Sequence, residues 1–170
     1  MKKILVTGAT GQLGSELKVL SSSYSQYEWI FADRTKVTLD DLDLLQSQLQ
    51  TIKPDIIFNC GAYTAVDKAE LEKELAFKIN HLAIELIAKY ATQNKVKLIH
   101  ISTDYVFDGT SSIALDEESD TNPINVYGES KLAGEIKCLK ENPESIIIRT
   151  SWVYSKFGNN FVKTMQRLMQ

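Results

Sequence analysis

The chain has few of the residues that build disulfide scaffolds and metal centres. Only two cysteines and two histidines occur among its 170 residues. Cys60 and Cys138 lie in apolar or helical surroundings without a partner at disulfide spacing, which favours a reducing compartment. His81 and His100 have no cysteine, histidine or glutamate set at metal-ligand spacing, so we expect both to be structural. The sequence therefore predicts neither a disulfide framework nor a metal site.

An excess of positive charge and long apolar runs are also absent. The formal net charge is -3, and the lysines are scattered. Nucleic-acid binding normally requires a concentrated basic face, so we expect no nucleic-acid partner. The start "MKKILVTGATG" begins like a secretory leader, but its apolar run stops at Thr7-Gly8, and no later segment approaches the ~20 apolar residues of a membrane span. We therefore expect a cytoplasmic protein that does not enter membranes.

Short runs rich in β-branched residues alternate with longer helical patterns along the whole chain. The predicted strands are nearly continuous in hydrophobicity, as is typical of strands covered on both faces. They occupy residues 3–8, 28–33, 55–60, 96–102 and 145–151, and the predicted helices occupy 12–20, 40–52, 70–94 and 127–142. This alternation predicts one doubly wound, Rossmann-like α/β domain over residues 1–170, with a parallel sheet and helices on both of its faces.

Two segments depart from this regular pattern. Residues 108–123 are polar and acidic, and so long a loop in a compact domain is more often functional or mobile than structural. Residues 159–170 have helical spacing but end without a glycine cap or a following proline. We therefore expect the domain to be truncated within or after this helix, with a C-terminal substrate-binding part missing.

A glycine-rich turn lies between the first predicted strand and the first predicted helix. In "ILVTGATGQLGSEL" the first glycine, Gly8, permits a tight turn, and Gly11 lets the backbone approach a pyrophosphate. Gly14 allows close packing of the helix on the sheet, and the helix N-terminus supplies N–H donors. The strand–turn–helix context predicts a dinucleotide site, and the spacing G-x-x-G-x-x-G resembles the extended short-chain dehydrogenases/reductases.

Two adjacent residues at the end of the second predicted strand favour different dinucleotides. Asp33 stands where a carboxylate accepts a hydrogen bond from a ribose 2′-hydroxyl, as in NAD-binding proteins. Arg34 follows directly and offers a guanidinium fork for a 2′-phosphate. We predict NADP as the cofactor, with NAD possible.

In "NVYGESKLAGE", Tyr127 precedes Lys131 by four residues, which places both side chains on one helix face. The lysine ammonium can hold a nicotinamide ribose and lower the pKa of the phenol, so that the tyrosine can give a proton to a carbonyl as hydride arrives. Ser102 and Thr103 end the fourth predicted strand, where ligands of such sheets bind. This combination predicts carbonyl reduction.

Five segments of the chain resemble the dTDP-4-dehydrorhamnose reductase family: "GATGQLGSEL", "NCGAYTAVDKAE", "STDYVFDGT", "NVYGESKLAGE" and "RTSWVYSKFGNNFVKTM". The resemblance implies reduction of the 4-keto group of dTDP-4-dehydro-L-rhamnose with NAD(P)H, for surface polysaccharide. It implies Thr103, Tyr127 and Lys131 as the catalytic set. The implied cofactor residues are Gly8, Thr10, Gly11, Gln12, Leu13, Gly14, Asp33, Arg34, Leu39, Cys60, Gly61, Ala62, Tyr63, Ser102, Tyr127 and Lys131. The implied sugar-nucleotide residues are Thr64, Val66, Asp104, Tyr105 and Trp152.

The comparison with this family and its neighbours leaves some alternatives open. Sugar-nucleotide dehydratases carry Asp-Glu where this chain has Asp104-Tyr105, so reduction is favoured over dehydration. The adenine contact falls at Thr38-Leu39, or at Asp40 if the register slips. Asn80 either holds the active-site region or is an ordinary helix-face residue. The functional alternatives are a non-catalytic regulatory subunit of the same fold and a sugar-nucleotide epimerase. We expect a homodimer in the full-length protein.

Overall fold

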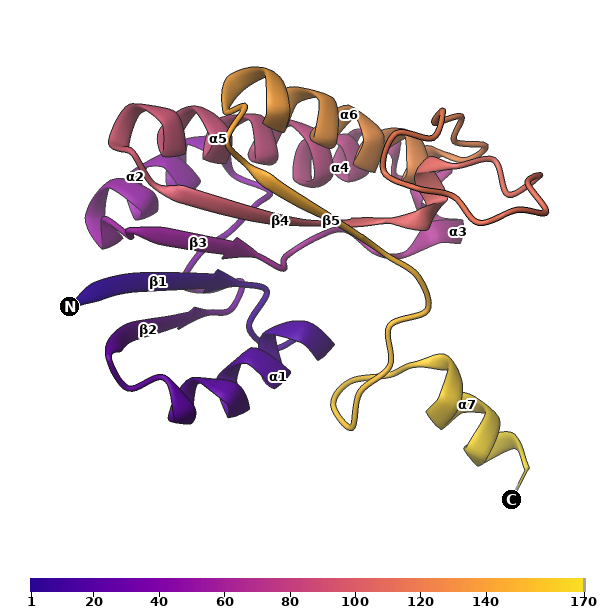
Figure 1. The fold of residues 1–170 in the computed structure, drawn as a ribbon, viewed down its shortest axis with the longest axis horizontal. Helices are drawn as coiled ribbons and strands as arrows, with labels where there is room; N and C mark the ends of the chain where they lie inside the picture. Colours follow the sequence, from indigo (N-terminus) through magenta and orange to yellow (C-terminus); the bar gives the residue numbers. More distant parts are fainter. Residues whose placement is uncertain (170) are drawn as a thin grey trace.

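The computed structural model describes residues 1–169, and it contains one parallel five-stranded sheet with the order β2-β1-β3-β4-β5 (Figure 1). Every neighbouring pair of strands is parallel, so each connection must cross over a face of the sheet. The strands are β1 (Lys2–Thr7), β2 (Tyr27–Ala32), β3 (Ile56–Asn59), β4 (Lys97–Thr103) and β5 (Ile146–Thr150).

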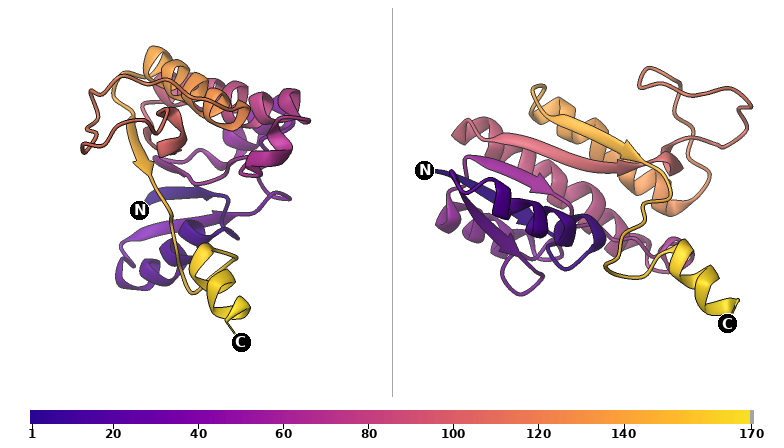
Figure 2. Two further views of the ribbon diagram at one scale, coloured as in Figure 1. Left: turned by 90° about the vertical axis from the view of Figure 1, so that its right-hand side faces the viewer. Right: turned by 60° about the horizontal axis from the view of Figure 1, so that its bottom comes forward.

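The order of the strands decides which helix covers which face. The chain moves outward from β1 to β2 through α1 (Gln12–Leu20), and it returns across β1 to β3 through α2 (Leu42–Ile52). Because crossovers are right-handed, this reversal puts α1 on one face and α2 on the other. The later crossovers α5 (Ala83–Asn94) and α6 (Val126–Glu141) continue in one direction and lie beside α2 (Figures 1 and 2). The predicted doubly wound sheet with helices on both faces is confirmed.

The larger core lies between the sheet and the layer formed by α2 and α5. Leu5, Ile57 and Leu98 project from three adjacent strands into a cluster with buried leucine and isoleucine side chains of the two helices. Leu49 of α2 is fully buried in this cluster, so truncation to alanine costs about 2–5 kcal/mol of unfolding free energy. This packing holds the carboxyl ends of β1, β3 and β4 in a fixed arrangement.

The opposite face of the sheet is aromatic near α1 and aliphatic near β5. Trp29 and Phe31 of β2 stack with a centroid distance of 5.8 Å, and Trp29 also stacks on Phe58 of β3. On β5, Ile146 and Ile148 point to this same face and remain 57% and 42% exposed. Among residues 1–169, α1 is the helix that lies directly under the sheet, and α7 (Phe161–Leu168) lies further along that side (Figure 1).

The predicted strands are confirmed to within two residues, and the helix predicted at 70–94 is wrong as a single helix. The chain there forms α3 (Val66–Ala69), α4 (Lys73–Phe77), the π-turn η2 (Lys78–Leu82) and then α5. Close packing on α6 accompanies the irregular turn, since a Cβ on Gly134 would lie 2.0 Å from the Asn80 carbonyl oxygen. Tertiary contacts outweigh the helical spacing at this point.

The remaining segments are short turns, one loop and the last helix. Short 3₁₀ turns occupy η1 (Ser21–Ser23) and η3 (Asp104–Val106). The predicted loop at 108–123 contains no helix or strand, as expected, and Figures 1 and 2 show it extending away from the body of the domain. The helix predicted at 159–170 is observed as α7, and Gln170 lies outside the described residues. Within residues 1–169, no helix combines the length and apolarity needed to cross a membrane.

Candidate active site

The order of the strands in the sheet reverses at β1, which has β2 on one side and β3 on the other. The predicted glycine turn follows β1 and lies at this point. Gly8 has a φ of +60°, and a Cβ there would lie 2.7 Å from the Gly61 Cα, at the carboxyl end of β3. The two loops therefore meet as bare backbone. In doubly wound sheets ligands bind in the crevice outside the carboxyl ends of strands at such a switch point. The geometry suits the close approach of a phosphate.

The first helix begins at this turn and directs its free N–H groups toward it. Gly11 caps α1 without a side-chain hydrogen bond, so the first-turn amides retain donor capacity. Gly14 is buried against the turn, and a Cβ there would lie 2.5 Å from the Gly8 carbonyl oxygen. Beneath the turn, the Thr7 hydroxyl donates to Asn59 at 2.6 Å and accepts from the Gly61 N–H at 3.2 Å. The turn is thus rigid and suited to an anion.

A cavity of about 430 Å³ extends from the glycine turn along the ends of β1, β2 and β3. It brings together seven predicted cofactor residues: Gly8, Thr10, Arg34, Leu39, Gly61, Ala62 and Tyr63. Val37, Asp40, Ala65 and Lys68 also line it, and the sequence reasoning missed all of these except Asp40, which it weighed as an adenine contact. Lys68 carries no motif that could have identified it, because its position depends on how α3 docks.

Asp33 and Arg34, the two residues that favour different cofactors, have distinct roles in the structure. The Asp33 carboxylate accepts hydrogen bonds from the Thr35 N–H at 2.9 Å, the Thr35 hydroxyl at 2.7 Å and the Lys36 N–H, and the Thr35 bonds hold the pKa of Asp33 below its usual value. Asp33 therefore shapes the turn after β2. Arg34 is exposed, pairs with Asp40 and lines the cavity. The arrangement favours Arg34 as the group that faces a ligand.

Tyr127 and Lys131 lie in the first turns of α6, which begins where the Asn125 side chain accepts from the Gly128 N–H at 2.8 Å. Both side chains are buried, and the Lys131 ammonium donates to the Ile101 carbonyl oxygen of β4 at 2.7 Å. Burial lowers the pKa of Lys131 to about 8, and the charge of Glu135 partly opposes this change. The lysine is thus tied to β4 beside the strand end that carries Thr103.

The sequence predicts a lowered pKa for the Tyr127 phenol, and the structure corrects this. Burial raises the pKa of Tyr127, the neighbouring Thr103 hydroxyl lowers it in part, and the charge of Asp104 raises it further. The Lys131 ammonium binds a backbone carbonyl instead of facing the phenol. Tyr127 is consequently protonated at neutral pH, the form that a proton donor requires. Thr103 and Tyr127 are brought together as predicted.

Asn80 is buried within the π-turn η2 and links two parts of the site. Its amide oxygen accepts from the Tyr63 N–H at 2.9 Å, and its amide nitrogen donates to the Tyr63 carbonyl and to the Ser130 hydroxyl, both at 3.0 Å. Ser130 in turn donates to the Tyr127 carbonyl oxygen at 2.7 Å. Of the two roles considered for Asn80, the structure supports the one in which it holds the active-site region in place.

The residues predicted to contact the sugar nucleotide are divided among three places. Tyr105 makes an edge-to-face contact with Tyr127 at 5.5 Å, and Asp104 accepts from the Thr103 hydroxyl at 3.1 Å and from Ser151 at 2.6 Å. Thr64 instead lines the cavity beside the glycine turn, and Val66 packs in the apolar cluster around Tyr127. Trp152 is 72% exposed and packs edge-to-face on Phe161 of α7.

Nine predicted cofactor residues do not line the 430 Å³ cavity: Gly11, Gly14, Asp33, Tyr127 and Lys131, whose positions are given above, and Gln12, Leu13, Cys60 and Ser102. Gln12 contacts the segment after β5, where it accepts from Asn160 at 3.0 Å. Leu13 lies on α1 beyond the turn. Cys60 follows β3, and burial raises the pKa of its thiol to about 12. Ser102 is buried in β4 with its side chain on the helix-covered face beside His100. For these positions a cofactor role stays a prediction.

The fold and the site together define a class of protein. A phosphate-suited glycine turn at a switch point, with a buried Tyr–Lys pair and a threonine at the next strand end, is typical of the extended short-chain dehydrogenases/reductases. The family model described as the RmlD substrate binding domain matches residues 1–170, and the chain therefore belongs to that family. The resemblance to dTDP-4-dehydrorhamnose reductases that the motifs indicate is thereby confirmed.

Characterised relatives cover nearly all of this chain. It is 42% identical over 168 residues to a dTDP-4-dehydrorhamnose reductase of Aggregatibacter actinomycetemcomitans and 46% identical over 170 residues to that of Salmonella typhimurium, covering 99% and 97% of this chain. A solved dTDP-4-dehydrorhamnose reductase of Bacillus anthracis, in complex with NADP, is 42% identical and superimposes with a TM-score of 0.92 over 99% of this chain. The chain spans 57%, 56% and 60% of these three proteins.

Proposed function

We propose that the protein carrying this sequence reduces the 4-keto group of dTDP-4-dehydro-L-rhamnose, or of a close keto-deoxy sugar nucleotide, with NADPH. The observation that carries the proposal is the position of Tyr127. It is a buried, protonated phenol beside Thr103, and its apolar cluster includes Tyr63, which lines the cavity at the glycine turn. The names of the relatives supply the substrate class, since they are 42–46% identical over nearly the whole chain.

The residues around the glycine turn fit a dinucleotide. Gly8 and Gly61 leave backbone space that a Cβ would fill, and the amides at the start of α1 would hold the pyrophosphate. Arg34 would pair with the 2′-phosphate, which favours NADP, while NAD is accepted less well. The solved relative from Bacillus anthracis was obtained with NADP. When bound, this cofactor supplies the hydride that C4 of the sugar receives.

Side chains of this protein then polarise and protonate the oxygen of the substrate carbonyl. The Thr103 hydroxyl donates a hydrogen bond to that oxygen, which polarises the C=O bond. Tyr127 transfers its phenolic proton to the same oxygen, so that the ketone becomes an alcohol and Tyr127 becomes a tyrosinate. The positive charge of Lys131 stabilises this tyrosinate and orients the ribose of the cofactor. Solvent then returns the proton to Tyr127.

The test is NADPH consumption by the whole protein with dTDP-4-dehydro-L-rhamnose, followed at 340 nm. We expect turnover in the wild type and a loss of about 10²–10⁴-fold in kcat for Tyr127→Phe, with the Kd for NADPH nearly unchanged. Tyr154→Phe, an exposed tyrosine after β5, is the matched control. Unchanged turnover in Tyr127→Phe would overturn the proton-donor role. Tightly retained NAD without net consumption would indicate an epimerase, and a stoichiometric enzyme partner without turnover would indicate a regulatory subunit.

A further inference from the structure

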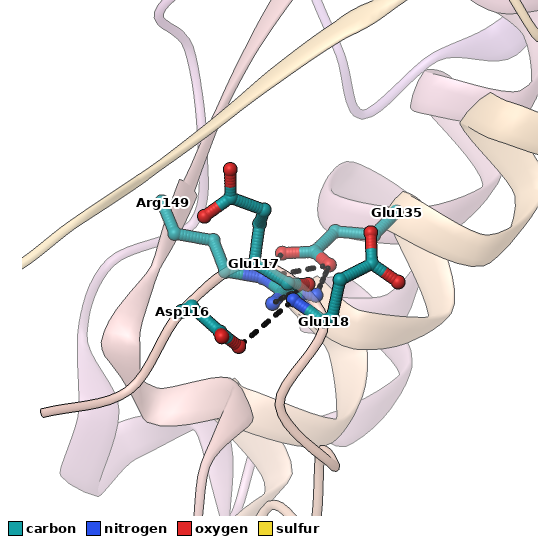
Figure 3. A network of polar contacts seen from close by, with 5 residues as sticks. All are labelled: Asp116, Glu117, Glu118, Glu135 and Arg149. Carbon is teal, nitrogen blue, oxygen red and sulfur yellow. Dashed lines mark hydrogen bonds and ion pairs between the residues drawn. The ribbon is translucent and has the colours of Figure 1, made fainter. Parts of the chain in front are cut away.

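Glu135 of α6 lies one turn beyond Lys131 and is buried, with 3% of its surface exposed. It forms a forked ion pair with Arg149 of β5. The Arg149 Nε donates to both carboxylate oxygens at 3.1 and 3.2 Å, and Nη2 donates to Oε2 at 2.7 Å (Figure 3). A bidentate pair of this kind fixes the orientation of both side chains. The next polar group on α6 after the Tyr–Lys pair is thus tied to the last strand of the sheet.

Arg149 also contacts the acidic loop at 108–122. Its Nη1 donates to the Glu117 carbonyl oxygen at 3.3 Å, and its guanidinium lies over the Phe107 ring at 5.1 Å. Figure 3 shows the loop residues Asp116, Glu117 and Glu118, whose side chains are exposed, beside the Arg149–Glu135 pair. One cation therefore joins the loop, β5 and α6.

The loop and the residue next to Thr103 line the same groove. This groove of about 850 Å³ is lined by the loop residues Ile113 and Leu115 and by Asp104 and Ser151. Asp104 is the residue that accepts from Thr103 and Ser151. The Arg149 contact with Glu117 therefore sets how closely the loop lies to the strand end that carries Thr103.

Every element packed against Lys131 contributes titratable or charged groups to its surroundings. Tyr127 and Glu135 lie on its own helix, His100 lies on β4, and Arg149 lies behind Glu135 on β5. On η2 and α5, the groups nearest to α6 are His81 and Glu85, and Glu85 pairs with Lys137 of α6 at 3.4 Å. The carboxylate of Glu135 favours the charged form of Lys131, and Arg149 compensates part of that carboxylate's charge.

We propose that Arg149 is a positioning residue of the reductase site, which balances the charge of Glu135 next to Lys131 and holds the 108–122 loop against the groove beside Asp104. The inference rests on the proposed function, because its main readout is the pH dependence of turnover. Lys131 must be charged to stabilise the tyrosinate, so turnover falls on the alkaline side as Lys131 loses its proton. Removal of Glu135 and removal of Arg149 should therefore shift this alkaline limb of the pH–kcat profile in opposite directions.

The experiment compares pH–kcat profiles of the whole protein with those of Glu135→Gln and Arg149→Met. Glu135→Gln removes the favourable carboxylate, so we expect the alkaline limb to move down by about one pH unit. Arg149→Met leaves that carboxylate uncompensated, so the limb should move up, by a smaller amount because Arg149 lies behind Glu135, and kcat should fall about 10–100-fold as the loop shifts. Arg149→Lys keeps the charge without the fork and should restore the limb but only part of kcat.

Glu129→Gln is the matched control, because Glu129 lies on the same helix with its side chain 45% exposed. It should leave both the limb and kcat unchanged. If the single variants do not fold, the double variant Glu135→Gln/Arg149→Met removes both charges, and its limb should lie between those of the wild type and Glu135→Gln. Displacement of the limb in the same direction by both single variants, or a limb in the double variant at or below that of Glu135→Gln, would overturn the proposal.

A separate readout does not depend on activity. Arg149→Met should increase the rate of limited proteolysis within residues 108–122 by about tenfold or more, because the loop loses its anchor. Arg149→Lys should be intermediate and Glu129→Gln unchanged. Equal cleavage rates in all variants would contradict the loop contact. A wild-type protein without NADPH turnover would instead contradict the proposed function, so the two failures are distinguishable.

Discussion

Tyr127 and Lys131 lie one turn apart on α6, but their functional groups bind different neighbours. The Lys131 ammonium donates to the Ile101 carbonyl oxygen at 2.7 Å, and the phenol of Tyr127 lies among Thr103, Asp104 and Tyr105. Under the proposed function the lysine would therefore act on the tyrosine through its charge and through the cofactor ribose. The phenol would then stay protonated until a carbonyl accepts its proton.

The buried charge of Lys131 predicts an unusual pH dependence of stability. Burial lowers its pKa from 10.5 to about 8 in the folded protein. Between these two values the unfolded chain binds more protons than the folded one, so stability rises with pH through this window. Below pH 8 the full penalty remains, roughly 3 kcal/mol. Urea unfolding of the wild type and of Lys131→Met at pH 7 to 10 measures this penalty. As the pH rises over this range, we expect the unfolding free energy of the wild type to increase relative to that of Lys131→Met by an amount of this order. A constant difference across the range would contradict the lowered pKa.

A comparison of Gly8 with Gly109 separates the cost of a positive φ from the cost of a steric clash. Both have positive φ, +60° and +73°, but a Cβ on Gly109 meets nothing within 4 Å, whereas one on Gly8 would lie 2.7 Å from Gly61. Gly109→Ala should cost about 1 kcal/mol of unfolding free energy and leave NADPH binding intact. Gly8→Ala should cost more and raise the Kd for NADPH at least tenfold. Chemical denaturation and fluorescence titration measure the two effects, and equal results for the two variants would exclude the close contact.

Asn80 should matter for stability and turnover together. Asn80→Ala leaves the Tyr63 N–H and carbonyl without partners and frees the Ser130 hydroxyl, so we expect a loss of about 2–4 kcal/mol of unfolding free energy. Because Tyr63 lines the cofactor cavity, the KM for NADPH should rise as well. Asn94→Ala, at the exposed end of α5, is the control and should change neither quantity by much. An Asn80→Ala protein with wild-type stability would contradict the bridging role.

Arg34 should decide the preference between the two cofactors. Arg34→Ala should raise the KM for NADPH by about 10–100-fold while the KM for NADH changes little, since only NADPH carries the 2′-phosphate. Asp40→Asn frees Arg34 from its ion pair and should lower the KM for NADPH. Steady-state kinetics with each cofactor in 50 and 200 mM salt checks both. Equal changes for NADPH and NADH in Arg34→Ala would indicate that the guanidinium does not contact the phosphate.

Much of the fold could be predicted because its signals are local. The strand at 2–7 contains the apolar run Ile4–Val6, and the turn after it needs glycine at Gly8, whose φ is positive. The positions of Tyr127 and Lys131 on one helix face follow from helical geometry alone. The break at 78–82 could not be predicted, since it accompanies the close packing of Gly134 on the Asn80 backbone. The spacing of apolar residues carries no information about that contact.

The sequence by itself determined the alternation of strands and helices, the glycine turn and the placement of Tyr127 and Lys131 on one helix face, because these depend on side-chain size, backbone freedom and periodicity. The catalytic set of Thr103, Tyr127 and Lys131 came from the family resemblance and stays a prediction. Tertiary structure alone decided which groups are buried and which groups they bind. It raised the pKa of Tyr127 and joined Arg149 to Glu135. Desolvation and pairing depend on segments that are distant in the chain, and they exist only once the sheet has brought those segments together.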